Sequence, residues 1–416
     1  MLTISDVKNK NFNLCVVGMG RIGLPLAVSF ALQGVKVFGT EKNKEKLQQL
    51  NNGITPFYEP HMKEALKKCL QNNKLVFSDD NNPVFDKCEI IIVAAGTPLK
   101  ENFQPDMSLI DNVISETCSL AKNNTIIVLR STLIPGMTKK RIIPKINKLN
   151  PSLKIAVCPE RLVEGNAMKE LRELAEIVGV EDESVGNIVR ELFLLLGKKQ
   201  ITITNTGTAE AAKIFTNVYR YVNFALANQL AIICEDLNVN ARDAIEIANK
   251  NYPRSKIPLP GPAAGPCLRK DGYFLSDTSL NLITTSRLLN ESIPTHIINT
   301  IERKYGPVLD KKIGVLGTAY KADIDDFRDS LAIKLIEELE GRGAKVISYD
   351  PNDSKSANIS EVLESEIVIL AVNHSEFDNI HAHKLKKAKL VYDAWGQFKK
   401  LDLNSHGIQY LMLGGF

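Results

Sequence analysis

The sequence predicts an α/β fold in which two domains with parallel β-sheets are joined by a long central helix. Three observations support this prediction. Apolar strand-like runs alternate with helix-like runs from residue 13 onward, a similar alternation returns after residue 312, and residues 207–250 contain no proline and place apolar side chains at helical spacing. We therefore expect an N-terminal domain (1–200), a central helical region (201–300) and a C-terminal α/β domain (301–416).

The N-terminal domain opens with one βαβ unit. NLCVVG (13–18) is an apolar strand, LPLAVSFALQG (24–34) is helix-like, and VKVFGTE (35–41) is a second strand. Further strands are expected in CEIIIVAAG (88–96) and NTIIVLRS (124–131). This pattern is typical of a Rossmann-type, doubly wound parallel sheet.

The turn between the first strand and helix, GMGRIG (18–23), has the G-x-G-x-x-G spacing of a dinucleotide-binding loop. Glycines there allow a tight turn and close approach to a pyrophosphate, whose charge the helix N-terminus stabilises.

Glu41 ends the second strand, where a carboxylate accepts hydrogen bonds from a ribose and repels a 2′-phosphate. This favours NAD over NADP, although Lys42 and Lys44 lie nearby. The alternative is a glycine turn that only packs helix on strand. The expected cofactor residues in this unit are Gly18, Gly20, Arg21, Ile22, Gly23 and Glu41.

The C-terminal domain repeats the plan more weakly. KKIGVLGTAYK (311–321) leads through a helical run into AKVISYDP (344–351), and SEIVILAVNHSEF (365–377) parallels the strand at 88–96. Its turn, GTAYKAD (317–323), lacks the second and third glycines. We therefore do not expect it to bind a second dinucleotide in the same way.

Composition argues against several classes of protein. A formal charge of +4, with no basic cluster beyond short lysine-rich runs, argues against a nucleic-acid partner. Seven cysteines, odd in number and without a CxxC pair, argue against a structural metal site or a disulfide framework and fit a reducing cytoplasm. The sequence shows no N-terminal apolar signal region and no apolar run of membrane-spanning length, so we expect no membrane partner.

A polar stripe lies on the predicted central helix. In EAAKIFTNVYR (210–220), Lys213, Asn217 and Arg220 share one helix face. A solvated face is the ordinary explanation, but the flanking sequence is apolar, and a lysine with an amide can stabilise an oxygen that becomes negative during reaction. The Lys-x-x-x-Asn pair after Gly207 resembles the β-hydroxyacid dehydrogenases, which remove one hydride from a small hydroxy acid. That alternative leaves the C-terminal domain and Cys267 unexplained.

The segment GPCLRKDGYFL (265–275) places Cys267 after a Gly-Pro turn and close to Lys270, a setting that favours the thiolate. An aldehyde has no second hydride to lose until a nucleophile adds to its carbon, and a thiolate does this well. The thiohemiacetal is oxidised to a thioester, which water cleaves, so that two NAD are reduced in all. Asp271 is placed to orient or deprotonate that water.

These elements occur in an order that resembles the UDP-glucose/GDP-mannose dehydrogenase family of nucleotide-sugar 6-dehydrogenases, over nearly the whole chain. Besides the segments above, the matching motifs are ITPFYEP (54–60), AAGTP (94–98), STLIPG (131–136), PERLVEG (159–165) and AYKADIDDFRDS (319–330). The resemblance implies an NAD-binding N-terminal domain, a central helix that forms a homodimer or higher oligomer, and a C-terminal domain that binds a UDP-sugar.

The resemblance also implies roles for single residues. Cys267 is the expected nucleophile, Lys213 stabilises the sugar oxyanion, and Asn217 and Asp271 hold a water. Thr132 and Glu160 match a pair near that water, and Thr97 and Thr132 join the cofactor residues. Arg254, in NYPRSKI (251–257), is expected to reach the substrate across the dimer interface. The expected substrate-binding residues are Glu160, Arg161, Leu162, Glu164, Lys213, Asn217, Arg220, Arg254, Lys321 and Arg328.

Plainer interpretations exist for some of these residues. Asp325, Asp326 and Arg328 can form surface ion pairs, and Thr132 can cap a helix. The loop before Cys267 also departs from the family, because PAAGP (262–266) stands where a glycine pair is usual. A dinucleotide-binding protein with a dead site is a third class, but the cysteine, lysine and asparagine are all present.

The sugar is expected to be a UDP-N-acetylhexosamine. YRYVN (219–223) and the ending GYFL (272–275) resemble the N-acetylhexosamine branch of the family, whereas Lys270-Asp271 resembles the glucose branch. UDP-glucose is therefore the alternative. The product would be a UDP-linked uronic acid, a precursor for surface polysaccharide or glycan.

Overall fold

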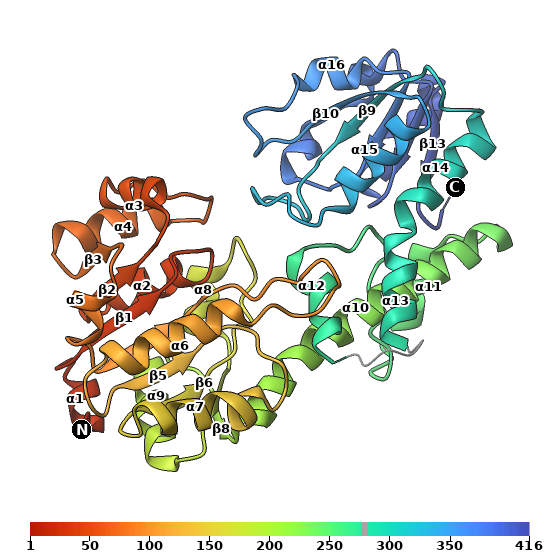
Figure 1. The fold of residues 1–416 in the computed structure, drawn as a ribbon. Helices are drawn as coiled ribbons and strands as arrows, with labels where there is room; N and C mark the ends of the chain where they lie inside the picture. The colour runs from red at the N-terminus through yellow and green to blue at the C-terminus, as the bar shows by residue number, and fades with distance from the viewer. Residues whose placement is uncertain (276–281, 416) are drawn as a thin grey trace. The chain divides into compact units, whose positions relative to one another are not determined.

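The computed structural model describes residues 1–275 and 282–415, whose strands form two separate sheets (Figure 1). The chain divides into two compact units. The first comprises residues 1–216 with 273–275, and the second comprises residues 217–272 with the described residues after 281. The helix α10 (Thr206–Leu237) belongs partly to each unit. The prediction of one long central helix is confirmed.

The first unit is built on an eight-stranded sheet in the order β3-β2-β1-β4-β5-β6-β7-β8. Its strands are β1 (Asn13–Val17), β2 (Lys36–Thr40), β3 (Leu75–Ser78), β4 (Ile90–Val93), β5 (Ile126–Leu129), β6 (Lys154–Val157), β7 (Glu176–Gly179) and β8 (Ile201–Thr204). Its helices are α1 (Ile4–Lys8), α2 (Gly23–Leu32), α3 (Lys44–Asn51), α4 (Met62–Gln71), α5 (Asn82–Phe85), α6 (Ser108–Leu120), the π-helix η1 (Thr138–Ile142), α7 (Ile143–Leu149), α8 (Ala167–Glu173) and α9 (Glu183–Leu194).

The first six strands follow the Rossmann order, which confirms the predicted fold class. The rest of the sheet was not predicted. β7 runs antiparallel to β6, with Val157 opposite Gly179, and β8 runs parallel to β7. An antiparallel neighbour starts at the sheet edge where the preceding strand ends. The connection through α8 therefore stays at the edge where β6 ends, and this edge carries the segment 159–165.

The second unit contains a five-stranded parallel sheet in the order β10-β9-β11-β12-β13. Its strands are β9 (Lys312–Leu316), β10 (Lys345–Tyr349), β11 (Ile367–Leu370), β12 (Leu390–Asp393) and β13 (Gln409–Met412). Besides its part of α10, its helices are α11 (Ala241–Asn249), α12 (Pro266–Asp271), α13 (Leu282–Glu291), α14 (Ile293–Tyr305), α15 (Leu331–Gly341) and α16 (Ile359–Leu363). Short 3₁₀ turns are η2 (Gly272–Phe274), η3 (Ser375–Asn379), η4 (Ala382–Leu385), η5 (Gln397–Leu401) and η6 (Leu403–His406).

The strand β11 illustrates why these apolar runs form central strands. Its residues alternate between two buried clusters, with Ile367 and Ile369 in one, and Val368 and Leu370 in the other. The first cluster includes residues of α14 and α15, and the second includes residues of α16. A strand buried on both faces needs apolar side chains at every position, which explains the uninterrupted IVIL sequence. The carboxyl ends of β9 and β11 adjoin where the strand order reverses, the usual ligand position in such sheets.

In the part of the chain that the structure describes, no helix has both the length and the apolar character needed to cross a bilayer.

Candidate active site

The glycine loop joins β1 to α2 and leaves room on its outer side. Gly18 has a φ of +91°, and a Cβ at Gly23 would lie 1.8 Å from the carbonyl oxygen of Gly18. Side chains at these two positions would break the turn. A Cβ at Gly20, by contrast, would meet no atom within 4 Å. Backbone at Gly20 can therefore be approached closely by a ligand.

Glu41 follows β2 directly and lies beside this loop. Its carboxylate forms an ion pair of 2.8 Å with Lys46 and accepts the Asn43 backbone N–H at 3.1 Å. Burial would raise the pKa of Glu41, but hydrogen bonds from Lys46, Asn43 and the Met19 backbone lower it overall. The group is thus held ionised next to the loop, which suits an acceptor for the ribose hydroxyls.

Two predicted cofactor residues follow neighbouring strands of the sheet. Thr97 lies after β4 and is buried, and Thr132 lies after β5 and is half-buried. The Ser131 hydroxyl donates to the Ala95 carbonyl at 2.6 Å, which ties the two segments together. The next helical element, η1, has Met137 at its start, so Thr132 does not cap it.

Arg21, of the glycine loop, meets a predicted substrate residue. Its Nε lies 3.8 Å from Glu164 Oε2, and its guanidinium lies 5.1 Å from the centre of the Phe57 ring. Glu59 reaches the same segment, because its carboxylate accepts the backbone N–H of Gly165 at 3.0 Å. The motifs at 18–23, 54–60 and 159–165 therefore converge within the first unit, although Glu59 was not singled out in the sequence.

Glu160 is held tightly by its surroundings. One carboxylate oxygen accepts the backbone N–H groups of Arg161 and Leu162, each at 2.5 Å, and the other pairs with the Arg130 guanidinium at 2.6 Å. The Arg161 side chain turns to the carbonyl of Ala175, and Leu162 packs against the apolar core. These contacts fix the start of the predicted substrate segment.

Arg130 organises a buried charge network that the sequence analysis missed. Besides Glu160, it contacts Glu176 at 2.8 Å, and Lys199 lies 3.3 Å from the same Glu176. Burial opposes the charge on Arg130, but Glu160 and Glu176 raise its pKa overall. The only local signal was a charged residue at the end of the apolar strand NTIIVLRS.

The polar stripe on α10 is only partly buried. Lys213 and Asn217 are each 6% exposed, whereas Arg220 is exposed. Two of the three stripe residues are thus withdrawn from solvent. This excludes the interpretation of the stripe as a fully solvated helix face.

Within the second unit, α12 carries both Cys267 and Asp271, and Asp271 contacts α10. Cys267 is exposed, while Asp271 is fully buried. The Asn217 amide donates to Asp271 Oδ2 at 2.7 Å, and Lys270 Nζ pairs with Asp271 Oδ1 at 2.9 Å. The structure therefore brings together Asn217 and Asp271, which are 54 residues apart in sequence.

The segment that contains Cys267 is also attached to the motif AYKADIDDFRDS. Gly265 has a φ of +106°, and a Cβ there would lie 2.6 Å from the Tyr320 ring. Arg269, of α12, pairs with Asp329 at 2.6 Å and with Glu291 at 3.0 Å. Glycine is thus required at one end of the substituted loop, and α12 is anchored to the loop that follows β9.

The remaining predicted substrate residues belong to the second unit. The Arg328 guanidinium pairs with the buried Asp326 at 2.5 Å, which supports the ion-pair interpretation for these two residues. Lys321 is half-buried in the same motif. Arg254 is exposed and stacks on Tyr252, with its guanidinium 4.7 Å from the ring centre.

Three domains of one family match the chain in sequence. The NAD binding domain of the UDP-glucose/GDP-mannose dehydrogenase family matches residues 12–196, the central domain matches residues 207–295, and the UDP binding domain matches residues 314–400. The chain belongs to this family. It is therefore an NAD-dependent oxidoreductase that acts on a nucleotide sugar.

Several relatives resemble the chain over almost its full length. The UDP-N-acetyl-D-mannosamine dehydrogenase of Pyrococcus horikoshii is 31% identical, over 91% of this chain and 94% of the relative. That of Methanocaldococcus jannaschii is 30% identical, over 96% of each. A solved structure of the UDP-D-ManNAc dehydrogenase from P. horikoshii superposes with a TM-score of 0.90 and covers 97% of this chain and 99% of that one.

The family assignment agrees with the geometry of the first unit. The open side of Gly20 and the ionised Glu41 fit the pyrophosphate and a ribose of NAD. The UDP binding domain also accounts for residues 314–400, which the hydroxyacid dehydrogenase alternative left unexplained.

Proposed function

We propose that this enzyme oxidises the C6 alcohol of a UDP-N-acetylhexosamine to the uronic acid, with Cys267 as covalent nucleophile. The observation that carries the proposal is the arrangement on α12, where an exposed thiol lies one helical turn from a buried carboxylate held by Asn217. An NAD-dependent oxidation of an alcohol to an aldehyde needs no thiol. Oxidation that continues to the acid needs a nucleophile that adds to the aldehyde, and a nearby thiol serves this purpose.

Bound NAD would accept one hydride in each of two oxidations, so each sugar yields two NADH. After the first oxidation, the Cys267 sulfur adds to the C6 aldehyde and forms a thiohemiacetal. Loss of a second hydride from that carbon leaves a thioester. Water then cleaves the carbon–sulfur bond, which releases the carboxylic acid and restores the thiol.

The other proposed catalytic residues have separate tasks in this scheme. Lys213 supplies a positive charge from α10 to the oxygen that becomes negative when sulfur or water adds to C6. Asn217 and Asp271 orient the hydrolytic water, because their mutual hydrogen bond fixes both side chains. We assign Thr132 and Glu160 to the same water, with Arg130 holding Glu160 in place.

The sugar is proposed from two kinds of support. YRYVN (219–223) resembles the N-acetylhexosamine branch, and the relatives described above are named for UDP-N-acetyl-D-mannosamine. N-acetylmannosamine is therefore the favoured hexosamine, and UDP-glucose is the alternative because of Lys270-Asp271.

The decisive measurement is the number of NADH formed per UDP-sugar consumed. UDP-N-acetylmannosamine, UDP-N-acetylglucosamine, UDP-N-acetylgalactosamine and UDP-glucose are offered separately to the full chain. We expect two NADH per molecule and a clear preference for UDP-N-acetylmannosamine. One NADH per molecule would refute the role of Cys267, and preference for UDP-glucose would refute the choice of sugar.

We also propose that the enzyme is a homodimer through the central helix. Phe215, Tyr219, Leu226 and Ile233 follow one face of α10, and each is at least 43% exposed. Such a continuous apolar face on a helix is typical of a surface that another chain covers. Arg254 is then available to complete the active site of the partner.

Light scattering at micromolar concentration tests the homodimer. Leu226→Asp, in the middle of this face, is expected to give monomers, because it would bury an unpaired charge in the interface. Leu149→Asp is the control, since Leu149 is equally apolar and 52% exposed on α7. A Leu226→Asp variant that keeps the mass of the wild type would exclude this interface.

A further inference from the structure

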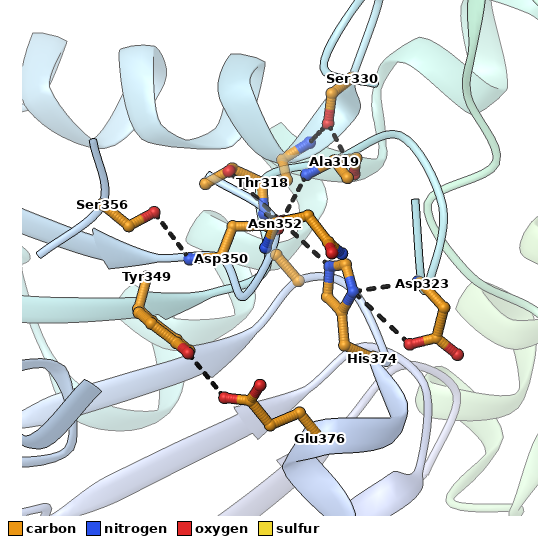
Figure 2. A network of polar contacts seen from close by, with 12 residues as sticks. Thr318, Ala319, Asp323, Ser330, Tyr349, Asp350, Asn352, Ser356, His374 and Glu376 are labelled. Carbon is orange, nitrogen blue, oxygen red and sulfur yellow. Dashed lines mark hydrogen bonds and ion pairs between the residues drawn. The ribbon is translucent and has the colours of Figure 1, made fainter. Parts of the chain in front are cut away.

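The loops that follow β9 and β11 are joined by a buried histidine, His374, whose side chain is fully buried (Figure 2). Its Nε2 lies 3.0 Å from Asp350 Oδ2, and the backbone N–H of Asp323 donates to its Nδ1 at 3.0 Å. These partners determine the tautomer. Nδ1 must be an acceptor for the Asp323 N–H, so the proton is on Nε2 and is donated to the Asp350 carboxylate.

Asp350 holds the other end of the same loop. Its Oδ2 accepts the backbone N–H groups of Thr318 at 2.7 Å and Ala319 at 2.9 Å. Burial would raise the pKa of Asp350, but interactions with His374 and with these two N–H groups lower it overall. A charged acceptor therefore fixes the start of the loop.

A second pair of hydrogen bonds holds the other end of this loop. The Asp323 carboxylate accepts the Ser375 backbone N–H at 2.9 Å and the Ser375 hydroxyl at 3.0 Å. Asp323 thus donates to one residue of the loop after β11 and accepts from the next. The segment 318–323 is held at both ends, with Lys321 between the two anchors.

The corresponding position in the first unit makes the use of Asp350 clear. In the first unit the Gly18 N–H donates to the Thr40 carbonyl at 2.9 Å, and in the second unit the Gly317 N–H donates to the Tyr349 carbonyl at 2.8 Å. Glu41 directly follows Thr40 and Asp350 directly follows Tyr349. The two acidic residues therefore occupy equivalent positions in their units. The Glu41 side chain keeps 14% of its surface exposed, whereas that of Asp350 keeps none. In the second unit this acid orders its own loop instead of facing a ribose.

We propose that His374 is a positioning residue for the nucleotide part of the substrate: together with Asp350 it clamps the segment 318–323 so that Lys321 meets the UDP group at the carboxyl ends of β9 and β11. This inference rests on the proposed function in taking Lys321 as a substrate contact. His374 itself touches no reacting atom in this scheme. Its loss should weaken binding of UDP and raise the KM for the UDP-sugar, while kcat at saturation changes little.

Two replacements separate positioning from packing. His374→Phe keeps a ring of similar size but removes both hydrogen bonds, whereas His374→Asn is smaller but keeps an acceptor near the place of Nδ1. If His374 acts through its hydrogen bonds, Phe weakens UDP binding about tenfold and Asn recovers part of that loss. If His374 acts only by filling space, the His374→Asn variant binds UDP more weakly than the His374→Phe variant.

Tyr349→Phe is the matched control, because it removes the hydrogen bond of 2.6 Å from Tyr349 to Glu376, two residues beyond His374, and leaves Asp350 and Asp323 untouched (Figure 2). Titration calorimetry of the full chain with UDP, and separately with NAD, gives the dissociation constants. We expect the wild type and Tyr349→Phe to bind UDP most tightly, His374→Asn to bind it less tightly, and His374→Phe to bind it most weakly. The affinity for NAD should be equal in all four.

Wild-type UDP affinity in His374→Phe, or a weaker affinity in His374→Asn than in His374→Phe, would overturn the inference and leave the proposed function intact. A wild-type chain that does not bind UDP would overturn both.

Discussion

In the proposed mechanism, the side chains of Cys267 and Asp271 have different tasks and different surroundings. The thiol is exposed and the carboxylate is buried, with a hydrogen bond from Asn217 and an ion pair from Lys270. We predict that Cys267→Ser lowers formation of the acid by at least about 10³-fold, because a hydroxyl without an activating base is a poor nucleophile. The UDP-linked acid released under saturating UDP-sugar measures this loss, and calorimetry with NAD should show unchanged cofactor binding. Normal turnover by this variant would rule out a thioester.

In our proposal Glu41 contacts the cofactor and not the UDP-sugar. We predict that Glu41→Ala raises the dissociation constant of NAD about tenfold, because the ribose loses a charged acceptor, and changes that of UDP less than twofold. Calorimetry with each ligand measures both values. Equal weakening of NAD and UDP would instead mean that Glu41 supports the fold as a whole, through Lys46 and Asn43.

The pH dependence of NAD binding follows from the same carboxylate. The pKa of Glu41 is lowered in the folded chain, so its ionised form persists throughout the neutral range. We predict that the affinity for NAD stays constant from neutral pH down to 4.5, the ordinary pKa of a glutamate, and falls only below it, where the carboxylate gains a proton and becomes a weaker acceptor for the ribose hydroxyls. A fall beginning near neutral pH would identify another titrating group. The Glu41→Ala variant should lack the acid step.

At the scale of elements, strands and helices were easier to predict than the contacts between them. The βαβ units at 13–41 and 312–351 were visible because uninterrupted apolar runs and glycine turns are local signals. The partners of Arg130 were not visible, because Glu160 and Glu176 lie 30 and 46 residues away. His374 was missed for the same reason, since its contacts to Asp350 and Asp323 depend on the order of three strands.

The Arg130 network joins elements that the sequence could not relate. Its guanidinium, at the end of β5, binds Glu160 after β6 and Glu176 at the start of β7. We predict that Arg130→Met destabilises the chain by about 3–5 kcal/mol, because two buried carboxylates lose their shared partner. Urea unfolding measures this change.

Arg141→Met is the control, since Arg141 is exposed and its pair with Asp111 is expected to contribute less than about 1 kcal/mol. Similar losses in both variants would show that the network contributes no special stability.

At the scale of the whole molecule, the two compact units have separate sheets and separate cores. The family assigns NAD to the first sheet and UDP to the second. A ligand stabilises the unit that binds it, by about 2.7 kcal/mol when its concentration is 100 times the dissociation constant.

We therefore predict that thermal unfolding followed by calorimetry resolves two transitions. NAD should raise the midpoint of one by roughly 5–10 °C, and UDP should raise the midpoint of the other by a similar amount. The Glu41→Ala variant identifies the first transition, because only the shift caused by NAD should shrink. A single transition that both ligands move equally would mean that the units unfold together, with α10 transmitting stability between them.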